Sequence, residues 1–561
     1  MFKTGFDYSN AQEPKKFAIR SRAARILVNV LVTLIFAAVY FYVSLPAINP
    51  QAQEFYTFIG ILCAVYIITS LITSGFQASA QGGAKEYFKY VKSQCKVSGI
   101  IILLLVAVGI VGTVSSWPLL RANSYKKLLE VEPGDFASEV TEISYDKIPM
   151  LDEDSAERLG DRKLGELADM VSQFEVSDDY TQINYNNRPV RVACLEYGDV
   201  IKWFNNRSEG LPAYIVIDMV TQNVDVVRLE NGIKYSKTEL FGRYLDRHQR
   251  FNYPTYMFGN ATFEVDEDGN PYWVCPRIVK RIGLFGGEDI SGAVLVNACT
   301  GESKYFAPEE IPTWVDRVYT ASLIIEQYDY YGTYRNGFFN SIFGQKDVTV
   351  TTDGYNYIAL NDDIWVYTGI TSVGGDQSNV GFILSNQRTK ETRYYSCAGA
   401  AEYSAMASAQ GVVQHLGYAA TFPLLLNISS QPTYFMALKD RAELVKMYAM
   451  VNVSQYQIVA TGNTVAECEK EYIRLMLQHG ITQNAVPVET NVSGVISEIR
   501  SAVISGNTMY YIRLANDASY YSISAADSEL AVILNVGDSV NIVYDEKSEG
   551  TLRRAVEITR S

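Results

Sequence analysis

Residues Ile26–Pro46 read ILVNVLVTLIFAAVYFYVSLP, an apolar run without one charged residue. Two more runs of this kind follow, Tyr56–Phe76 (YTFIGILCAVYIITSLITSGF) and Ser98–Leu120 (SGIIILLLVAVGIVGTVSSWPLL). A helix rises ~1.5 Å per residue, so each run is long enough to cross a hydrocarbon core of ~30 Å. No further run of this length occurs between Arg121 and Ser561. The sequence therefore predicts a three-helix membrane anchor, residues 26–120, followed by one large region outside the membrane.

The basic residues around these runs predict how the anchor is oriented. Most of them precede the first run or lie between the second and the third, whereas the loop Ala47–Phe55 has none. In chain order they are Lys3, Lys15, Lys16, Arg20, Arg22 and Arg25, then Lys85, Lys89, Lys92 and Lys96, and after the third run Arg121, Lys126 and Lys127. The positive-inside rule then makes residues 1–25 a cytoplasmic tail. Residues 121–561 are expected to be extracytoplasmic, at a bacterial-type plasma membrane. A cleaved signal peptide is less favoured, because the first run exceeds a typical signal core.

The charge balance limits the classes of partner. The whole chain has a net charge of −14, and the anchor region is basic, so the acidic excess lies in the region after the anchor. Nucleic-acid binding depends on Lys and Arg that neutralise phosphates. We therefore expect no nucleic-acid partner, and we expect contact with membrane lipid and with a protein of the cell envelope.

An internal repeat organises the region after the anchor. In each copy an apolar strand runs into Asp or Asn, a short turn follows, and a second strand leads away. The Asp or Asn is expected to bond a backbone amide two residues on, and Gly301 to adopt a positive φ. In three copies a Thr three residues later is expected to bond another amide, whereas the copy at Tyr434 has Glu443 in its place. The copies begin at Gly292 (GAVLVNACTGESKYF), Gly381 (GFILSNQRTKETRYY), Tyr214 (YIVIDMVTQNVDVV) and Tyr434 (YFMALKDRAELVK).

Helices are expected between these copies, after a short juxtamembrane stalk at residues 121–153. They are placed from Asp154, from Ser236 with Glu239 in a capping box, over Pro312–Tyr331, over Ala398–Val413, and from Thr464, boxed by Glu467, to Gly480. Turns are expected at Asn186–Pro189 and at Asp266–Asn270.

A helix followed by antiparallel strands with a strand–(Asp/Asn)-x-x-Thr-Gly-Glu–strand hairpin resembles the PepSY family of small exported α+β modules. The match is closest at Val296–Glu302, within residues 236–306, although Asn297 replaces the family's usual Asp. The resemblance implies non-catalytic modules that regulate peptidases or bind envelope partners. On this basis residues 154–310 are expected to be PepSY-like α+β modules, and residues 311–480 further modules with the repeated hairpin.

A linker, residues 481–489, is expected to precede a different final unit, residues 490–561. Five short strands are predicted there: Ser493–Ile499, Met509–Leu514, Tyr520–Ile523, Ser539–Tyr544 and Leu552–Ile558, with turns at Ser505–Asn507 and Asn535–Asp538. This pattern resembles a small β-barrel of OB or SH3-like type. The predicted fold class is therefore a membrane-anchored α+β protein with tandem helix-plus-hairpin modules and a C-terminal small β-barrel.

The first candidate binding site is basic. Arg243, Arg247 and Arg250, with the adjacent His248, are spaced to share one face of the helix expected from Ser236. This face would grip an anionic group or an acidic partner. The alternative is pairing with carboxylates of the same chain, such as Glu239.

The second candidate site is an aromatic stretch that forms either a partner patch or part of the core. Its members are Tyr330, Tyr331, Tyr334, Phe338, Phe339 and Phe343. Cys275 and Cys299 fall on predicted strands of one sheet and are the best candidates for a disulfide, with free buried thiols as the alternative. No pattern of ligands predicts a metal or cofactor, and no nucleophile elbow or other catalytic motif is present.

Together these features favour a multi-span cell-envelope protein that binds or regulates other envelope proteins without catalysis. Two alternatives remain open at this point: a membrane-anchored hydrolase acting on cell wall or peptides, and a structural subunit of a membrane complex. An enzyme predicts a cleft that gathers carboxylates with shifted pKa values. A binding protein predicts an apolar or arginine-lined groove.

Overall fold

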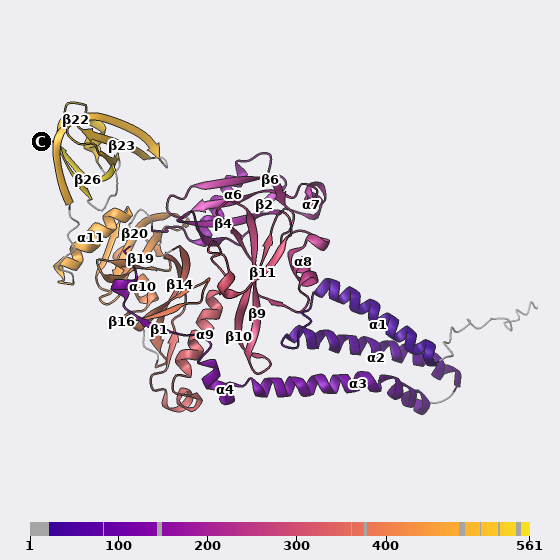
Figure 1. Ribbon diagram of the computed structural model, residues 1–561. Helices are drawn as coiled ribbons and strands as arrows, with labels where there is room; N and C mark the ends of the chain where they lie inside the picture. Colours follow the sequence, from indigo (N-terminus) through magenta and orange to yellow (C-terminus); the bar gives the residue numbers. More distant parts are fainter. Residues whose placement is uncertain are drawn as a thin grey trace, which may run out of the picture.

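The structure is a computed structural model that describes residues 22–81, 84–142, 148–360, 362–374, 378–481, 489–504, 507–525, 528–545 and 551–560. Three long helices, α1 (Arg22–Ser44), α2 (Gln53–Gln81) and α3 (Ala84–Ser115), project side by side from the rest of the molecule (Figure 1). Each contains a stretch long and apolar enough to cross a membrane. The chain is therefore an integral membrane protein with a three-helix anchor. Lys3, Lys15, Lys16 and Arg20 lie outside the described residues, as do the side chains of Lys85 and Lys89.

The anchor helices do not end where the apolar runs end. The expected loop between the second and third runs is largely helical, since α2 continues to Gln81 and α3 begins at Ala84. Ala, Lys, Glu and Gln in this segment favour helix whether or not lipid surrounds them. At the other end α3 stops at Ser115, and a separate helix, α4 (Pro118–Tyr125), begins with Pro118 in its first turn. Proline fits there because the first helical N–H groups have no intrahelical acceptor.

The expected stalk, residues 121–153, is instead folded into the globular part. Its strand β1 (Glu132–Gly134) pairs in parallel with β16 (Thr392–Ala400), and α5 (Phe136–Glu139) follows directly. Leu129 and Ile148 are buried in the core. These apolar side chains stabilise the segment against the sheets, so the anchor and the globular part are joined without a free spacer.

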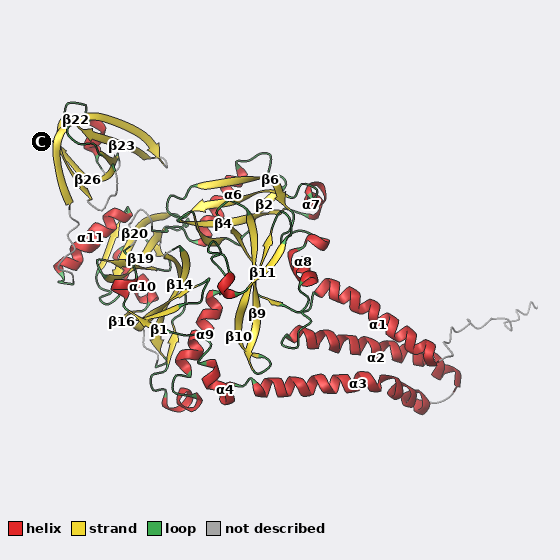
Figure 2. Ribbon diagram, in the orientation of Figure 1, coloured by secondary structure: helices red, strands yellow, loops and turns green. Residues whose placement is uncertain are grey.

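Four sheets of one connectivity follow (Figure 2). In each unit a helix precedes five strands, the first and second strands both pair with the third, and the third, fourth and fifth are antiparallel neighbours in that order. The first unit has α6 (Glu153–Gly165), β2 (Phe174–Val176), β3 (Thr181–Tyr185), β4 (Arg188–Tyr197), α7 (Val200–Asn206), β5 (Leu211–Asp218) and β6 (Val224–Ile233). The second has α8 (Leu245–Asn252), β7 (Met257–Phe258), β8 (Thr262–Val265), β9 (Pro271–Ile282), β10 (Gly286–Asn297) and β11 (Ser303–Phe306).

The third unit has α9 (Ala321–Thr333), β12 (Thr349–Thr351), β13 (Asn356–Leu360), β14 (Asp363–Ser372), β15 (Ser378–Asn386) and β16, with β1 as an added edge strand. The fourth has α10 (Glu402–Val412), β17 (Ala419–Ala420), β18 (Leu424–Ile428), β19 (Gln431–Lys439), β20 (Val445–Asn452) and β21 (Val459–Gly462), and α11 (Val465–Gln478) follows. Shared buried cores join the first unit to the second, the second to the third around α9, and the third to the fourth. The internal repeat is therefore a tandem array of packed units.

The repeated turn has the predicted chemistry in three units. It joins the fourth strand to the fifth, and the Asp or Asn side chain accepts hydrogen bonds from the amides two and three residues on. The acceptors are Asp218, Asn297 and Asn386, and the residues after the shared Thr have φ values of 60° at Gln222, 76° at Gly301 and 68° at Lys390. The turns at Asn186–Asn187 and Asp266–Asn270 are also confirmed as the links from β3 to β4 and from β8 to β9.

The fourth copy of the repeat was placed one hairpin too early. The turn at Asp440 joins β19 to β20, the third and fourth strands, whereas the equivalent turn of this unit begins at Asn452. The error has a physical origin, because Asp440 also accepts hydrogen bonds from two turn amides, those of Ala442 and Leu444. The same local chemistry serves two different hairpins, and only the sheet order separates them.

Replacing Gln222 by Gly is expected to stabilise the first unit by about 1 kcal/mol. A residue with a Cβ pays ~1–2 kcal/mol for the left-handed conformation, and glycine does not. Part of this gain is offset because glycine has more conformational entropy in the unfolded chain. Hydrogen exchange of the β5 and β6 amides in the full chain measures the change. Gln222→Ala is the matched control and should give no gain, because alanine keeps the Cβ. Equal protection of both variants would contradict the argument.

The starts of several helices differ from the sequence expectation. Helix α6 begins at Glu153 with Asp152 as its cap, and α9 begins only at Ala321, capped by Thr320. Ser236 does accept hydrogen bonds from the amides of Thr238 and Glu239, but the next α-helix begins only at Leu245. The Glu239 carboxylate turns away to accept from Tyr197 and Trp203. Helix α10 covers the inner part of its expected range, and α11 begins after Thr464 as predicted.

The final unit contains the five predicted strands, and their pairings form a closed ring in the order β22–β23–β24–β26–β25. Their bounds are β22 (Glu489–Ile504), β23 (Asn507–Leu514), β24 (Tyr520–Ser524), β25 (Ser539–Asp545) and β26 (Leu552–Arg560), with α12 (Glu529–Ile533) between β24 and β25. This unit has its own buried core and lies at the opposite end of the molecule from the anchor (Figure 1). Most of the expected linker 481–489 and part of the turn at Ser505–Asn507 lie outside the described residues.

Candidate functional site

Two arginines of the predicted basic face, Arg247 and Arg250, hold the globular part to the membrane anchor. Arg243 lies in a short 3-10 helix, η2 (Phe241–Arg243), and only Arg247 and Arg250 lie on α8. The Arg247 Nε donates to the Tyr42 carbonyl (3.1 Å), and the Arg250 Nε donates to the Leu45 carbonyl (2.9 Å). Tyr42 lies in the last turn of α1 and Leu45 directly follows this helix, where carbonyl groups lack intrahelical donors. The hydrogen-bond acceptors of these two side chains are therefore backbone carbonyl groups, where the sequence suggested an anionic group or a carboxylate.

The other two members of the predicted face bind within the globular part. The Arg243 Nη1 donates to the carbonyl of Arg207 (2.5 Å), the residue that directly follows α7. The His248 Nε2 lies 2.8 Å from the Gly301 carbonyl in the repeated turn of the second unit. Burial lowers the pKa of His248. The structure therefore does not bring the four residues together around one ligand.

The second unit also forms hydrogen bonds with the loop between α1 and α2 and with the end of α3. The Ile48 amide donates to the Pro254 carbonyl (2.8 Å), and the Gln51 side-chain amide donates to the Lys280 carbonyl (2.9 Å). At the turn between β9 and β10, the Phe285 amide donates to the Ser116 hydroxyl (3.0 Å) just beyond α3. The loop between α1 and α2 and the end of α3 therefore lie on the same side as the globular part, as three spans require.

The aromatic stretch divides into a buried and an exposed half. Tyr330 packs on Tyr125 of α4 with ring centroids 4.6 Å apart, and Tyr331 contacts the core around α9. Tyr334 and Phe338 continue the stack, whereas Phe339 and Phe343, beside the π-helical turn η4 (Asn340–Gly344), point to solvent, Phe343 with 80% of its surface exposed. The first part of the stretch therefore packs within the globular part, and the role of the exposed part as a partner patch stays a prediction.

Cys275 and Cys299 are both free in the structure. Cys275 faces Val294 in the β9–β10 ladder, and the last pair of that ladder is Asn297 with Tyr272, so Cys299 lies beyond its end. Three residues of strand span roughly 10 Å, more than the ~7 Å that a disulfide bridges between Cα atoms. Cys275 instead accepts a hydrogen bond from the Gln249 side chain (2.7 Å) and behaves as a buried small side chain.

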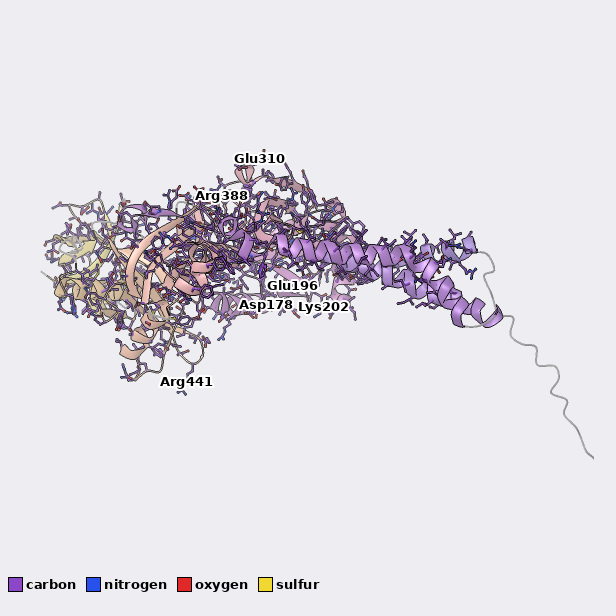
Figure 3. All side chains as sticks on the ribbon, turned by 90° about the horizontal axis from the view of Figure 1, so that it is seen from below. Asp178, Glu196, Lys202, Glu310, Arg388 and Arg441 are labelled. Atoms are coloured by element: carbon purple, nitrogen blue, oxygen red, sulfur yellow. The ribbon has the colours of Figure 1, made fainter. Side chains whose placement is uncertain are left out.

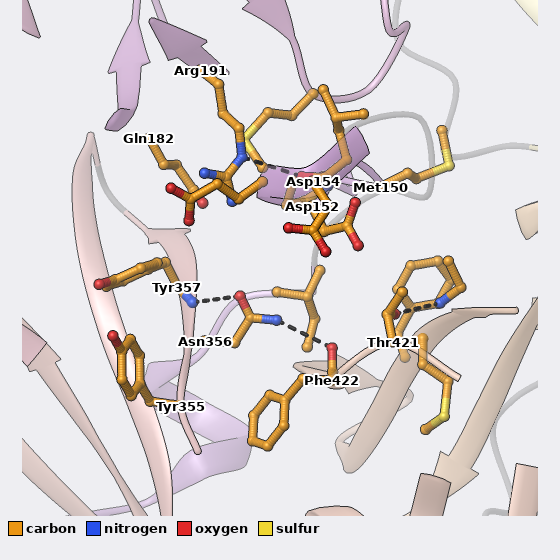
Figure 4. Close-up of a pocket in the computed structure, with 18 residues that line it drawn as sticks. Met150, Asp152, Asp154, Gln182, Arg191, Tyr355, Asn356, Tyr357, Thr421 and Phe422 are labelled. Carbon is orange, nitrogen blue, oxygen red and sulfur yellow. Dashed lines mark hydrogen bonds between the residues drawn. The ribbon is translucent and has the colours of Figure 1, made fainter. Parts of the chain in front are cut away.

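A groove of about 280 Å³ lies where the first, third and fourth units meet (Figure 4). The segment before α6 forms one wall, with Met150 and the acidic run Asp152–Asp154. The strands β3 and β4 contribute Gln182 and Arg191, and the third and fourth units contribute aromatic and apolar side chains. These are Tyr355, Tyr357, Phe422, Leu424, Phe435 and Met436, with the polar Thr421 beside them. The groove is therefore mostly apolar, with a few polar groups, as ligand sites in proteins usually are.

Arg191 is the most unusual group in this groove. Its side chain is buried, and its two hydrogen bonds are long, 3.4 Å to each of the Leu151 and Tyr180 carbonyls. Burial lowers its pKa. The side-chain amide nitrogen of Gln182, also buried, has no hydrogen-bond partner among the residues that the structure describes. Two donors in one wall therefore lack strong acceptors, and an unsatisfied buried donor costs ~1–3 kcal/mol.

An ion pair with the fourth unit holds the acidic rim of the groove, residues Asp152–Asp154, in place. Lys439 forms an ion pair with Asp152, which is also the cap of α6. Although burial acts to raise it, the pKa of Asp152 is lowered, because Lys439 and Ser155 donate hydrogen bonds to the carboxylate. Glu153 and Asp154 are exposed on the same rim. The groove thus offers a buried cation at its wall and carboxylates at its mouth.

A second cavity of about 420 Å³ lies beside α7 and is lined by Trp203, Lys237, Glu239 and Tyr244, among others. The buried Glu239 carboxylate accepts from the Tyr197 hydroxyl and the Trp203 indole N–H, each at 2.8 Å. These bonds satisfy the carboxylate from within the first unit. They explain why this glutamate is not available as a helix cap.

A pair of buried carboxyl groups lies at the junction of the first three units. Glu264 of β8 accepts from the amides of Asp316 (2.8 Å) and Arg317 (3.1 Å). One oxygen of Asp316 accepts from the Asn184 amide (2.6 Å), and its other oxygen has no partner in the structure. Burial raises the pKa of Glu264 to about 7, and burial together with Glu264 raises that of Asp316. Burial therefore favours the protonated, neutral form of both carboxyl groups.

Sequence reasoning did not select Arg191, Gln182 or the Glu264–Asp316 pair. A charged residue inside the apolar strand Arg188–Tyr197 is a usable signal for Arg191, because buried arginines are rare without a purpose. Among the described residues, no group of three or more His, Cys, Asp or Glu is arranged to hold a metal ion.

Comparisons with protein-family models, with curated proteins and with solved structures find no significant match to this chain. Its class therefore follows from its own architecture: a membrane-anchored α+β protein with tandem hairpin sheets outside the anchor.

Proposed function

We propose that this chain is a binding protein of the cell envelope that captures a segment of another protein in the groove lined by Arg191. Its N-terminus is cytoplasmic and residues 121–561 are extracytoplasmic, at a bacterial-type plasma membrane. The charges around the spans support this orientation. The PepSY-like character of the four units and the OB or SH3-like character of the barrel belong to the same proposal, supported by the repeated turn and by the ring of strands.

The pair of unsatisfied donors is the observation that carries the proposal. A carboxylate of a bound segment, placed between Arg191 and Gln182, would accept from both side chains. Hydrogen bonds between arginine and carboxylate are short, directional and about twice as strong as neutral ones. Tyr355, Tyr357 and Phe422 supply apolar and aromatic contacts for the rest of the segment. A volume of about 280 Å³ suits one or two side chains rather than a folded domain.

The positions of the carboxyl groups favour binding over hydrolysis. Among the residues that the structure describes, the carboxyl groups whose pKa is raised are those of Asp161, Glu264, Asp316, Asp329 and Glu402. None of these five lines the groove or the second cavity, and Glu264 and Asp316 are completely buried. The groove itself holds a carboxyl group with a lowered pKa, Asp152, which suits ion pairing better than proton donation.

Replacing Arg191 by Met is expected to weaken capture roughly 10- to 100-fold, because a hydrogen-bonded charge pair contributes ~1.5–3 kcal/mol. The measurement is a photo-crosslink from a benzoylphenylalanine placed at Tyr355, which is partly exposed at the groove. Its adduct with a partner should form in intact cells and disappear in the Arg191→Met chain.

The same photo-crosslinker at Tyr456, exposed in the turn before β21, is the matched control for proximity. The Arg191→Met chain should keep the melting behaviour of the parent, since apolar replacement of a buried charge is often neutral. An unchanged adduct from Tyr355 in a folded Arg191→Met chain would refute the groove as the site of capture.

A second candidate function, structural subunit of a membrane complex, is favoured by one observation. Phe339, Ile342 and Phe343 are exposed together at the turn after α9. Large apolar side chains gathered on a surface often mark protein contacts. If the Phe343→Ser chain no longer co-purified with a complex but still formed the adduct from Tyr355, the complex would bind the turn after α9 instead of the groove.

A further inference from the structure

A second exposed apolar surface lies on the first two units, next to the anchor. It consists of Val200, Ile201 and Phe204 on α7, Phe241 on η2 and Phe251 on α8, each with 55–73% of its surface exposed. Val200, Ile201 and Phe204 occupy positions of α7 that share one helical face. We call these five residues the α7 face. Exposed apolar side chains gathered on one surface often mark contacts with protein or membrane.

The α7 face is continuous with the outer end of the first membrane helix. The Phe251 ring lies 5.6 Å from that of Phe41 and 6.2 Å from that of Tyr42. Arg247, on the same helix as Phe251, lies over the Tyr42 ring at 4.1 Å and bonds its carbonyl. Figure 3 places Lys202 of α7 at the end of the globular part from which the anchor helices leave. The face therefore lies at the level where α1 emerges from lipid.

Basic and aromatic groups flank this face in the pattern of interfacial segments. The Arg207 guanidinium lies over the Phe204 ring at 4.5 Å and over the Trp203 ring at 5.5 Å. Arg243 is held beside Arg207 by its bond to the Arg207 carbonyl. Surfaces that lie on a bilayer combine apolar side chains, which enter the acyl boundary, with Lys and Arg, which meet the headgroups.

We infer that the α7 face is a second membrane contact, which enters the outer leaflet of the same bilayer that the anchor crosses. Lipid is the partner that the geometry favours for this face, because Phe251 of the face packs directly on Phe41 and Tyr42 of the membrane helix α1. Val200, Ile201, Phe204 and Phe241 enter the acyl boundary, and Arg207 and Arg243 meet phosphate groups. With the joint at α8, this contact sets the angle of the globular part to the membrane.

The test places tryptophan in the face and measures quenching by lipid. Phe204→Trp and Phe241→Trp are made separately in the full chain carrying Trp117→Phe, and each is reconstituted in nanodiscs of phosphatidylcholine and phosphatidylglycerol. Brominated acyl chains quench only tryptophans that contact them. Both variants are expected to lose most of the added emission in brominated nanodiscs, and Tyr456→Trp in the fourth unit is expected to keep its emission.

A further variant separates lipid from other occupants. Ile201→Glu added to Phe204→Trp places a charge at the centre of the face and is expected to restore the emission in brominated nanodiscs. Emission from both tryptophans that matches the Tyr456→Trp control would overturn the inference. Blue-shifted emission without bromine quenching would overturn it as well, since it would mean that protein, as a second copy of the chain, covers the face.

Discussion

Raising the pH from about 4.5 to about 7 is expected to destabilise the junction of the first three units by roughly 3 kcal/mol, because over this range the unfolded chain releases the Glu264 proton while the folded chain still holds it. Its pKa is about 7 in the folded chain against 4.5 for an ordinary glutamate. Burial is the main cause, since an ionised carboxylate in the interior gives up its hydration.

The sign follows from which state holds the proton. Between the two pKa values the folded chain keeps the proton on Glu264 and the unfolded chain has released it, so stability falls as the pH rises. Below 4.5 both states are protonated and the full contribution is present. Asp316 acts in the same direction, because burial and the neighbouring Glu264 raise its pKa too. The junction is therefore strongest in mild acid, contrary to the behaviour of ion-paired carboxylates.

Glu264→Gln tests this directly, because the amide has the shape of the protonated acid and does not titrate. The variant loses one oxygen acceptor for the amides of Asp316 and Arg317, so it should be less stable than the parent in acid, by about 1 kcal/mol. Near neutral pH the order should reverse. Hydrogen exchange of β8 and of residues 316–317 in the full chain, corrected for the intrinsic exchange rate at each pH, measures the stability difference between variant and parent in acid and near neutral pH.

Glu267→Gln is the matched control, since this glutamate is exposed in the turn after β8. Its pH dependence should follow that of the parent. Parallel curves for the parent and Glu264→Gln, without a crossing, would mean that Glu264 is ionised throughout and that another group dominates the junction.

Sequence patterns predicted the parts of this molecule whose cause is local. Three apolar runs are enough for the three helices, because the bilayer demands length and apolarity alone. The turns at Asp218, Asn297 and Asn386 were predictable because one side chain satisfies amides two and three residues away. The five strands of the final unit followed from alternation and turn residues.

What could not be predicted depends on contacts between distant segments. Arg191 lines a groove only because the first, third and fourth units meet there, and no spacing in the chain encodes that meeting. Glu239 was expected to cap a helix, but Tyr197 and Trp203 offer it stronger donors in the interior. Arg250 was expected to bind a negatively charged group, but it donates to backbone carbonyl groups. Because every residue has a carbonyl group, no sequence motif identifies which ones an arginine will bind.

Replacing Arg250 by Met is expected to loosen the joint between the anchor and the globular part by about 2 kcal/mol, equivalent to roughly thirtyfold faster local opening. Arg250 donates to Leu45 at the end of α1 (2.9 Å) and to Tyr256 in the second unit (2.5 Å). Methionine fills the same volume but leaves these carbonyls without donors in a half-buried site. Hydrogen exchange of residues 45–52, where the Ile48 amide bonds Pro254, reports the opening.

Two comparisons separate this role from general destabilisation. Arg228→Met removes an exposed arginine paired with Asp169 and should leave the exchange of residues 45–52 unchanged. Arg250→Lys keeps the charge but cannot reach both carbonyls at once, so its exchange should be intermediate. If Arg250→Lys matched the parent, charge alone would hold the joint. If Arg250→Met also matched it, the contacts at Ile48, Gln51 and Phe285 would be sufficient, and the arginines of α8 would be free to serve lipid headgroups instead.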